Sequence, residues 1–340
     1  MIKPERLKKG DTVAIVSLSW GGLGDEQFIH KFDIAKKRLE EEFGLNVKVM
    51  PHALKGSKFV LEHPELRAQD LMEAFKDKDV NAIICAVGGD DTIRTLPYID
   101  FDVIKNNPKI FMGYSDSTIN HFMMHKAGLI SYYGPCIMAE FGEYVKMFDY
   151  TKEAIVNILF NDSTNLEIKP SPKWTKQYIP WDIKNINLSK KLIDDPYGYE
   201  LLNGNGVVSG NVLGGCIEVF PMAYNTVIWP LDWDNKILLV ETSEEKPEPE
   251  YFKKLLEDLG NMGIFNKVKG MIVGKPYEGV YYEEYKDVIK EVINKYNREL
   301  PVLYNINIGH ATPIGIIPLG VDIEVNYDEK KIKILESATK

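Results

Sequence analysis

The chain has 340 residues, of which 44% are hydrophobic and 27% are charged, a composition that excludes disordered, collagen-like and coiled-coil proteins. At about 150 residues per domain, this length predicts two domains, each large enough to bury its own core. Lys and Arg number 41 against 50 Asp and Glu, and the resulting net charge of −9 argues against nucleic acid as a partner.

The cysteines and the N-terminal residues indicate the cellular compartment. Cys85, Cys136 and Cys216 are widely spaced, which fits neither a disulfide framework nor a CxxC metal or redox site. The chain begins MIKPERLKKGD, without the apolar stretch of a signal peptide, and nowhere do 18 apolar residues run together. We therefore expect a cytoplasmic protein with buried free thiols and no contact with a membrane.

Short apolar runs alternate with longer amphipathic ones between residue 12 and about residue 160. The pattern predicts strands at 12–18, 45–50, 81–89 and 108–116, and helices at 25–44, from Pro64 onward and over about 117–127. Asp25 would cap the first helix and Gly44 would end it. Strands and helices in this order predict a parallel sheet with helices on both faces, in an N-terminal domain over residues 1–165.

The rest of the chain divides into two parts. Residues 166–206 are polar, rich in proline and without lasting periodicity, which is typical of a linker or a substrate-binding loop. Residues 207–340 contain predicted strands at 237–241, 268–274 and 301–307 and an amphipathic helix near 282–297. The last residues alternate like antiparallel hairpins, so we expect a second, smaller and more β-rich α/β domain.

The most specific local feature is the run GYSDST at 113–118, between a strand and a helix. Ser115 would lie on a sharp turn at the carboxyl edge of the sheet, as in a nucleophile elbow, where the helix N-terminus faces the developing oxyanion. The run differs from the usual GxSxG because residue 117 is serine. An ordinary helix-capping serine is the alternative interpretation.

A second glycine turn, GGDDT at 88–92, follows the strand at 81–87. Paired glycines allow close backbone approach and leave N–H groups free for an oxyanion or a phosphate, although a plain tight turn remains open. The run is one residue from the GGDGT turn of NAD and lipid kinases, but the Asp91 carboxylate would repel a phosphate. If the strands before the two turns are neighbours, both turns line one crevice.

A serine nucleophile needs a base, usually a histidine oriented by a carboxylate. Six histidines are present. Three are expected at the surface, and two more, His121 and His125, share a helix face but have no third metal ligand and no HExxH glutamate. The first three are His30, His52 and His63.

His310 differs because it follows a strand directly, in the turn NIGHATP at 307–313, from which an imidazole can project into a cleft between domains. Glu241 ends the apolar run ILLVE, where an unpaired charge would be costly, and so is the candidate partner. The alternative is a simple strand-end residue at the start of the acidic loop 241–250.

Several motifs in the same order resemble the LD-carboxypeptidase family of serine peptidases, and within it the branch of the microcin C immunity protein. They are LKKGDTVAIVS near the start, VGGDDT, GYSDST, a central segment with tryptophans, VSGNVLGG at 208–215, LLVETSEE and NIGHATP. Ordered motifs over some 300 residues are far more specific than any one of them.

This resemblance implies a Rossmann-like layered N-terminal domain, a smaller swivelling C-terminal domain, a site between them and a homodimer. It implies that Ser115 is the nucleophile, His310 the general base and acid, and Glu241 the carboxylate that orients it. The family's oxyanion hole corresponds to backbone N–H groups near Gly89, Asp90 and Asp116. The chemistry would be acyl transfer and hydrolysis with no metal or cofactor.

The substrate implied by the resemblance is a small peptide or an aminoacyl-nucleotide conjugate. The murein-recycling branch removes a terminal D-alanine from a muropeptide, whereas the immunity branch cleaves an aminoacyl group from a nucleotide-like leaving group. Trp174 or Trp181 would stack on the nucleobase, or both would only anchor their segment. A phosphotransferase and a non-catalytic binding protein are the remaining alternatives. We expect activity to fall in acid near pH ~6.5, unless the site shifts the pKa of His310.

Overall fold

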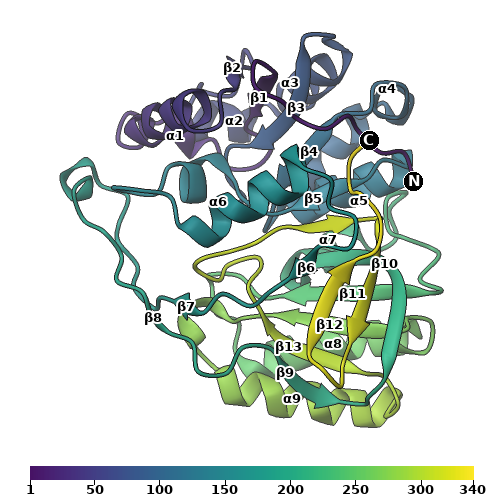
Figure 1. The fold of residues 1–340 in the computed structure, drawn as a ribbon. Helices are drawn as coiled ribbons and strands as arrows, with labels where there is room; N and C mark the ends of the chain where they lie inside the picture. The colour runs from purple at the N-terminus through teal and green to yellow at the C-terminus, as the bar shows by residue number, and fades with distance from the viewer.

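The computed structural model describes residues 1–340 and builds them around two sheets, one above the other in Figure 1. The upper sheet has the strand order β14-β5-β4-β3-β1-β2 and is parallel except for β14, which runs antiparallel to β5. Its strands are β1 Thr12–Val16, β2 Asn46–Val49, β3 Val80–Cys85, β4 Ile110–Gly113, β5 Ser131–Tyr133 and β14 Ile317–Leu319.

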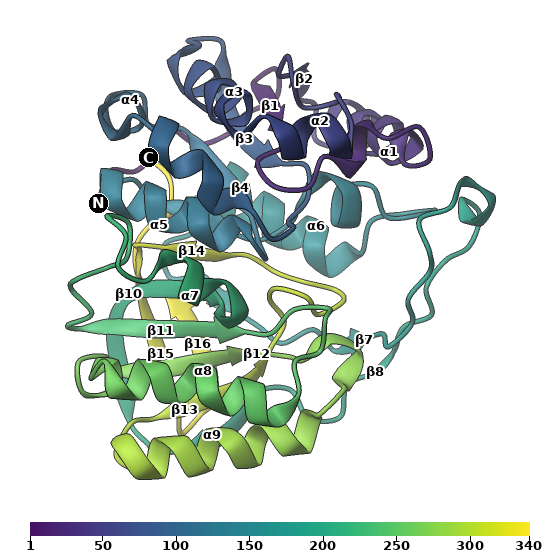
Figure 2. The same cartoon turned by 180° about the vertical axis from the view of Figure 1, so that it is seen from behind.

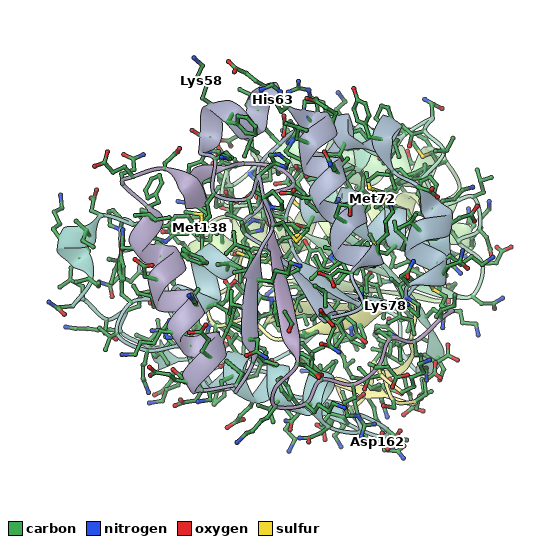
Figure 3. The ribbon with its side chains drawn as sticks, turned by 90° about the horizontal axis from the view of Figure 1, so that it is seen from above. Lys58, His63, Met72, Lys78, Met138 and Asp162 are labelled. Atoms are coloured by element: carbon green, nitrogen blue, oxygen red, sulfur yellow. The ribbon has the colours of Figure 1, made fainter.

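Alternating residues of β1 pack against helices on opposite faces of this sheet. Val13 and Ile15 share a core cluster with Leu39 of α1, whereas Ala14 and Val16 share another with Leu71 and Phe75 of α3. Figure 3 looks down on this arrangement, with α1 on one side of the first strands and the helix that carries Met72, α3, on the other. The parallel sheet covered on both faces is therefore confirmed. Its helices are α1 Ile29–Glu41, α2 Ser57–Glu62, α3 Pro64–Lys76, α4 Phe101–Asn106, α5 Ser117–Ala127 and α6 Asp149–Ile155.

The helix boundaries agree with the sequence in two cases and differ in one. Helix α3 has Pro64 in its first turn, and α5 covers the residues predicted for it. Helix α1 begins four residues later than predicted, and Asp25 does not cap it. The Asp25 carboxylate instead accepts a hydrogen bond of 2.8 Å from the N–H of Ser57, because the 22–28 segment forms a separate turn that faces α2.

The lower sheet is larger and mixed, as expected for a more β-rich unit. Strands β10 to β13 are parallel, and antiparallel strands extend the sheet on both sides in the order β6-β16-β15-β10-β11-β12-β13-β9. Their bounds are β6 Glu167–Ile168, β9 Glu200–Asn203, β10 Val207–Cys216, β11 Lys236–Glu241, β12 Gly270–Gly274, β13 Val302–Ile306, β15 Asp322–Asn326 and β16 Lys331–Ile334.

Two long helices, α8 Pro249–Asn261 and α9 Tyr282–Tyr296, lie side by side in front of this sheet in Figure 2. The sequence analysis predicted α9 but not α8. The short helix α7, Phe220–Ala223, packs near α5 of the upper layer. No helix of the structure combines the length and apolar character needed to cross a lipid bilayer.

The polar segment between the two layers runs down one side of the molecule, at the left of Figure 1. After β6 it contains the two-residue strands β7, Lys173–Trp174, and β8, Ile193–Asp194, and one 3-10 turn at Ile183–Asn185, before β9 enters the lower sheet. A buried ion pair of 2.5 Å between Asp195 and Lys275 attaches the segment to the end of β12. Strand β14 returns from the C-terminal part to the upper sheet, so the two layers are linked twice.

Candidate active site

Ser115 lies on the turn between β4 and α5 with a φ of 63°, a left-handed conformation that is costly for a serine. Strands β3 and β4 are parallel neighbours, so the turn after β3 lies beside this serine, as expected. A Cβ atom on Gly88 would lie 2.9 Å from Ser115 Oγ, so only glycine allows this approach. The strained serine therefore faces the paired-glycine turn.

Buried hydrogen bonds hold this turn in place. The His121 ring contacts Ser131 Oγ at 2.8 Å and the Gly113 carbonyl oxygen at 2.9 Å, and burial lowers the pKa of His121 to about 4. Thr118 Oγ1 donates to the Ser115 carbonyl over 2.7 Å and accepts the N–H of Cys216 from the lower sheet. His121 thus supports the turn, and Thr118 connects the turn, which belongs to the upper layer, to the lower sheet.

Asp116 joins the two glycine-containing turns. Its buried carboxylate accepts hydrogen bonds from Ser19 Oγ at 2.5 Å and from the N–H of Thr92 at 2.8 Å. Burial raises the pKa of this carboxyl group. The backbone N–H groups of Gly89, Asp90 and Asp116 donate to no other group of the chain, so they are available to an external acceptor.

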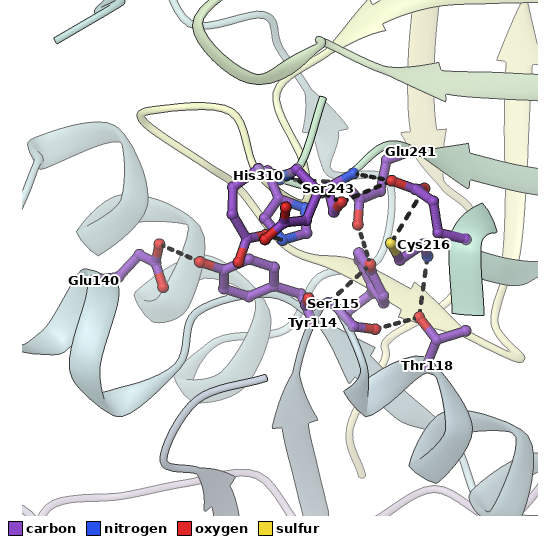
Figure 4. A network of polar contacts seen from close by, with 12 residues as sticks. Tyr114, Ser115, Thr118, Glu140, Cys216, Glu241, Ser243 and His310 are labelled. Carbon is purple, nitrogen blue, oxygen red and sulfur yellow. Dashed lines mark hydrogen bonds and ion pairs between the residues drawn. The ribbon is translucent and has the colours of Figure 1, made fainter. Parts of the chain in front are cut away.

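The second half of the site comes from the lower sheet. Glu241 ends β11 and is fully buried, and its Oε2 lies 2.8 Å from His310 Nδ1 and 3.2 Å from the His310 backbone nitrogen (Figure 4). Gly309 has a φ of 65°, and a Cβ atom there would lie 2.2 Å from the Glu241 carboxylate. Glycine at 309 is therefore required for the carboxylate to lie against this backbone.

Tyr133, which the sequence analysis did not single out, connects the two halves. Its hydroxyl accepts the N–H of Ser115 at 3.1 Å and donates to Glu241 Oε1 at 2.5 Å. Burial and the Glu241 charge raise the pKa of Tyr133 well above its usual value, so the hydroxyl keeps its proton. Its place at the end of β5, beside β4, was the available signal, because neighbouring parallel strands end at the same edge.

The other ring nitrogen of His310 has a partner that the sequence analysis also missed. His310 Nε2 lies 2.8 Å from Glu244 Oε2, and no hydrogen bond joins it to Ser115 Oγ. Burial lowers the pKa of His310, but the Glu241 and Glu244 carboxylates outweigh it and hold the pKa well above 6.5. The structure brings Ser115, Glu241 and His310 to one site without the serine–histidine contact.

These groups face a cavity of about 480 Å³ between the two layers. Ser115, Tyr114, His310 and the Gly88–Gly89 turn line one part of it, and Trp20, Phe28 and Trp181 line another. Trp181 comes from the polar segment 166–206 and meets Phe28 edge to face at 6.4 Å. Trp174 is not among the lining residues.

Trp174 is buried in β7 and packs on the ammonium group of Lys275, whose Nζ lies 4.4 Å from the ring centroid. The structure therefore separates the two tryptophans of the segment. Trp174 anchors the segment to the lower sheet, and Trp181 reaches the cavity.

His30 is buried, contrary to the expectation of a surface position. It lies 2.9 Å from the Tyr144 hydroxyl and stacks on that ring, because α1 turns this residue toward the 137–144 segment. His52 pairs with the buried Asp70 at 2.8 Å, and His63 is half-exposed beside Glu65. These three histidines lie away from the cavity, whose lining includes only His310.

Cys216, Glu241 and His310 place metal-ligand atoms within 4.8 Å of one another. All three ligands are already engaged or protonated in this arrangement. Burial and the nearby Glu218 carboxylate raise the pKa of the Cys216 thiol well above its usual value, and both Glu241 oxygens accept hydrogen bonds. A metal ion there would have to displace the contact between Glu241 and His310.

A serine on a strained strand-to-helix turn, in one cavity with a histidine held by a buried carboxylate, is the arrangement of a serine-type hydrolase. Residues 13–134 match the model of the LD-carboxypeptidase N-terminal domain, and residues 209–325 match that of the LD-carboxypeptidase C-terminal domain. The chain belongs to the LD-carboxypeptidase family, and it is a serine-type carboxypeptidase in the hydrolase class.

Two curated relatives have different names. The microcin C7 self-immunity protein MccF of Escherichia coli is 32% identical over 289 residues, which cover 79% of this chain and 78% of that protein. The "Probable murein peptide carboxypeptidase" of Bacillus subtilis is 28% identical over 333 residues, which cover 96% of this chain and 92% of that protein.

Solved structures of MccF-like proteins share the fold. An MccF-like protein from Streptococcus pneumoniae in complex with AMP superposes with a TM-score of 0.88 at 36% identity, covering 96% of this chain and 98% of that one. MccF in complex with glutamyl sulfamoyl guanosine superposes with a TM-score of 0.87 at 27% identity, covering 100% of both chains.

Proposed function

We propose that the protein hydrolyses the amide bond between an aminoacyl group and a nucleotide-like leaving group, through an acyl-enzyme on Ser115. The observation that carries this proposal is the contact of 2.8 Å between Glu241 and His310 at the cavity that Ser115 lines. Histidine held by a carboxylate is the usual means of activating a serine hydroxyl.

In the first half of the proposed reaction, Ser115 Oγ attacks the carbonyl carbon while neutral His310 takes the hydroxyl proton on Nε2. Glu241 accepts the Nδ1–H of His310, which fixes the tautomer and stabilises the imidazolium that forms. The carbonyl oxygen becomes an oxyanion, for which the free N–H groups of Gly89, Asp90 and Asp116 are the available donors.

In the second half, the C–N bond breaks and the leaving nitrogen takes the proton from His310 Nε2. This step leaves an ester between the acyl group and Ser115 Oγ. A water molecule then transfers a proton to His310 and attacks the ester, and the return of that proton to Ser115 Oγ releases the carboxylic acid. The cycle consumes one water and restores each side chain.

The aromatic part of the cavity supports a nucleotide-like leaving group. Trp20, Phe28 and Trp181 gather there, and aromatic stacking on a base contributes ~1–3 kcal/mol. The related MccF and MccF-like proteins have been solved with glutamyl sulfamoyl guanosine and with AMP, respectively. The cavity also lies within the usual ~300–1,000 Å³ of small-molecule sites.

Murein tetrapeptide is the second candidate substrate, because similarity to the Bacillus murein peptide carboxypeptidase covers 96% of the chain. Both candidates can be tested in one experiment. The protein is incubated separately with an aminoacyl sulfamoyl adenosine and with a murein tetrapeptide, and the released amino acid is measured. We expect release from the first substrate, loss of at least ~10³-fold in rate with Ser115→Ala, and little change with Ser117→Ala.

Equal rates for Ser115→Ala and the unmodified protein would contradict the proposed nucleophile. Release from the tetrapeptide alone would assign the protein to cell-wall recycling. Recovery of both compounds intact would favour a binding protein, and magnesium-dependent consumption of ATP would favour a phosphotransferase using the 88–92 turn.

The predicted organisation belongs to the same proposal. We infer a homodimer in the cytoplasm, with domains over 1–165 and 207–340 joined by the loop 166–206, except that strand β14 of the second domain adds to the sheet of the first. Light scattering after size exclusion is expected to give twice the chain mass, and a monomer would contradict the dimer. Limited proteolysis is expected to cut first within 166–206, and cell fractionation would test the compartment.

A further inference from the structure

His310 is held between two carboxylates, with Glu241 at Nδ1 and Glu244 at Nε2, each at 2.8 Å. A neutral imidazole has one N–H to donate, whereas an imidazolium has two, so this arrangement suits the charged ring. In that state Nε2 carries a proton and points to Glu244. In this structure His310 is therefore arranged as an imidazolium, which cannot accept a proton on Nε2.

The other groups around the ring carry no charge that would compete. Tyr114 meets the imidazole edge to face at 5.1 Å, the Cys216 thiol lies within 4.8 Å of a ring nitrogen, and Tyr133 contacts Glu241. Burial raises the pKa of all three groups well above its usual value, so they stay neutral. Only the two carboxylates that touch the ring decide its charge.

Glu244 also differs from the other carboxylates that line the cavity. Glu143 has a lysine partner in Lys190 at 2.7 Å, and Glu278 has one in Lys246 at 2.6 Å. Glu140 is half-buried and accepts hydrogen bonds from the Cys136 N–H at 2.9 Å and the Tyr114 hydroxyl at 3.3 Å.

Glu244 has only the imidazolium as its counter-charge. Burial raises the pKa of its carboxyl group, but the hydrogen bond and charge of His310 lower the pKa to about 2. Its side chain is 55% exposed, so an incoming cation can reach it from the cavity. When the ring becomes neutral to act as a base, this carboxylate loses its partner.

An aminoacyl substrate carries a suitable cation. Its α-ammonium group is separated from the scissile carbonyl carbon by a single Cα atom, so it enters the cavity together with the reacting carbonyl. We propose that Glu244 binds this ammonium group and that the ammonium displaces His310 from Glu244, which frees Nε2 for Ser115. This inference rests on the proposed function and names the specificity of the same site.

The exchange balances in charge and protons. The substrate ammonium keeps its protons and replaces one cation at Glu244 with another. The displaced imidazolium, now facing one carboxylate instead of two, gives its Nε2 proton to solvent and becomes the base. Substrates with an ammonium group next to the carbonyl thus activate the enzyme, and substrates without it leave His310 held at Glu244.

The test compares an aminoacyl sulfamoyl adenosine with its deamino analogue, in which hydrogen replaces the ammonium group. The analogue adds no bulk, so a steric clash cannot account for its rejection. We expect the unmodified protein to favour the amine by roughly 10- to 100-fold in kcat/KM, the range of a charged hydrogen bond. Glu244→Gln should remove this preference by raising KM for the amine, with the deamino rate equal or higher. Glu245→Gln, an exposed neighbour in the same loop, should leave the preference intact.

Two further measurements do not depend on turnover. The NMR titration of His310 should show a lower pKa in Glu244→Gln, and calorimetry should show that Ser115→Ala binds the amine more tightly than the deamino analogue. Equal kcat/KM for both compounds, or a preference retained by Glu244→Gln, would overturn the inference while leaving the proposed function intact. If neither compound is turned over faster than by Ser115→Ala, the proposed function fails, and equal binding in calorimetry overturns the inference as well.

Discussion

The Tyr133 hydroxyl donates a hydrogen bond of 2.5 Å to Glu241 Oε1 at the buried junction of the two layers. Because the same hydroxyl accepts the N–H of Ser115, a single oxygen atom fixes the distance between the serine turn of the upper sheet and the carboxylate of the lower sheet. This contact accounts for how two separate sheets hold one site.

Tyr133→Phe should therefore impair activity more than folding. The substitution leaves a buried carboxylate oxygen and the Ser115 N–H without hydrogen-bond partners. The loss raises the free energy of the correctly arranged active site by about 1–3 kcal/mol. We expect kcat/KM to fall roughly 10- to 100-fold, because the same free energy is added to the activation barrier. Tyr132→Phe is the matched control, because Tyr132 is equally buried and its hydroxyl donates to the Ala338 carbonyl, away from the cavity. Equal losses of activity in both variants would contradict the assigned contact.

The left-handed backbone at Ser115 predicts that the catalytic serine lowers the free energy of unfolding. Ser115→Gly and Ser115→Ala should both be inactive, but only glycine relieves the left-handed conformation. We expect Ser115→Gly to be more stable than Ser115→Ala by about 1 kcal/mol, since a left-handed residue with a side chain costs ~1–2 kcal/mol and glycine loses some backbone entropy on folding. Urea unfolding of the two variants measures this difference. An alanine variant of equal or greater stability would argue against strain at this turn.

The raised pKa of His310 predicts the pH dependence of the reaction. Because kcat/KM reports the free enzyme, its acid limb should lie above pH ~6.5, where the imidazolium held by Glu241 and Glu244 loses its proton. The same shift stabilises the fold below pH ~6.5, and this contribution is lost as the pH rises through the raised pKa. The measurement is a profile of kcat/KM from pH 5 to pH 10, with Glu241→Gln expected to lower the pKa of His310. An acid limb below pH 6 would contradict a His310 imidazolium stabilised by both carboxylates.

Trp181 and Trp174 should respond differently to substitution. Trp181→Ala removes a ring that lines the cavity and should raise KM for nucleotide-like leaving groups by roughly 5- to 150-fold, the equivalent of ~1–3 kcal/mol of base stacking. Trp174→Ala should lower the melting temperature, because that ring is buried against Lys275. Steady-state kinetics and thermal unfolding of both variants separate the two roles. An unchanged KM in Trp181→Ala would exclude stacking by this residue.

Much of the fold could be predicted because it repeats regular patterns. The alternation of strands and helices predicted the parallel upper sheet, and the two faces of β1 follow directly from its period of two residues. Helix α8 was missed although Phe252, Leu255, Leu256 and Leu259 have helical spacing, because the sequence analysis predicted no element between the acidic loop 241–250 and the strand at 268–274.

The candidate site could be predicted only in part. Ser115, Glu241 and His310 each stand at the end of a strand or on a turn, which is where parallel sheets place functional side chains. Tyr133 also stands at the end of a strand, but its role depends on a contact across the two layers. Glu244 gave no comparable signal, since it lies in a loop after β11 and its role depends on its contact with His310. Trp174 and Trp181 lie in one irregular segment, and only its path decides which ring reaches the cavity.

The amino-acid sequence by itself determined the layered α/β architecture and the types of side chain at the strand ends, because periodicity and turn chemistry are local properties of the chain. Only the tertiary structure decided that His310 Nε2 pairs with Glu244 instead of Ser115. A hydrogen bond depends on distances of a few tenths of an ångström between atoms from separate segments, and those distances are set by the packing of the whole molecule.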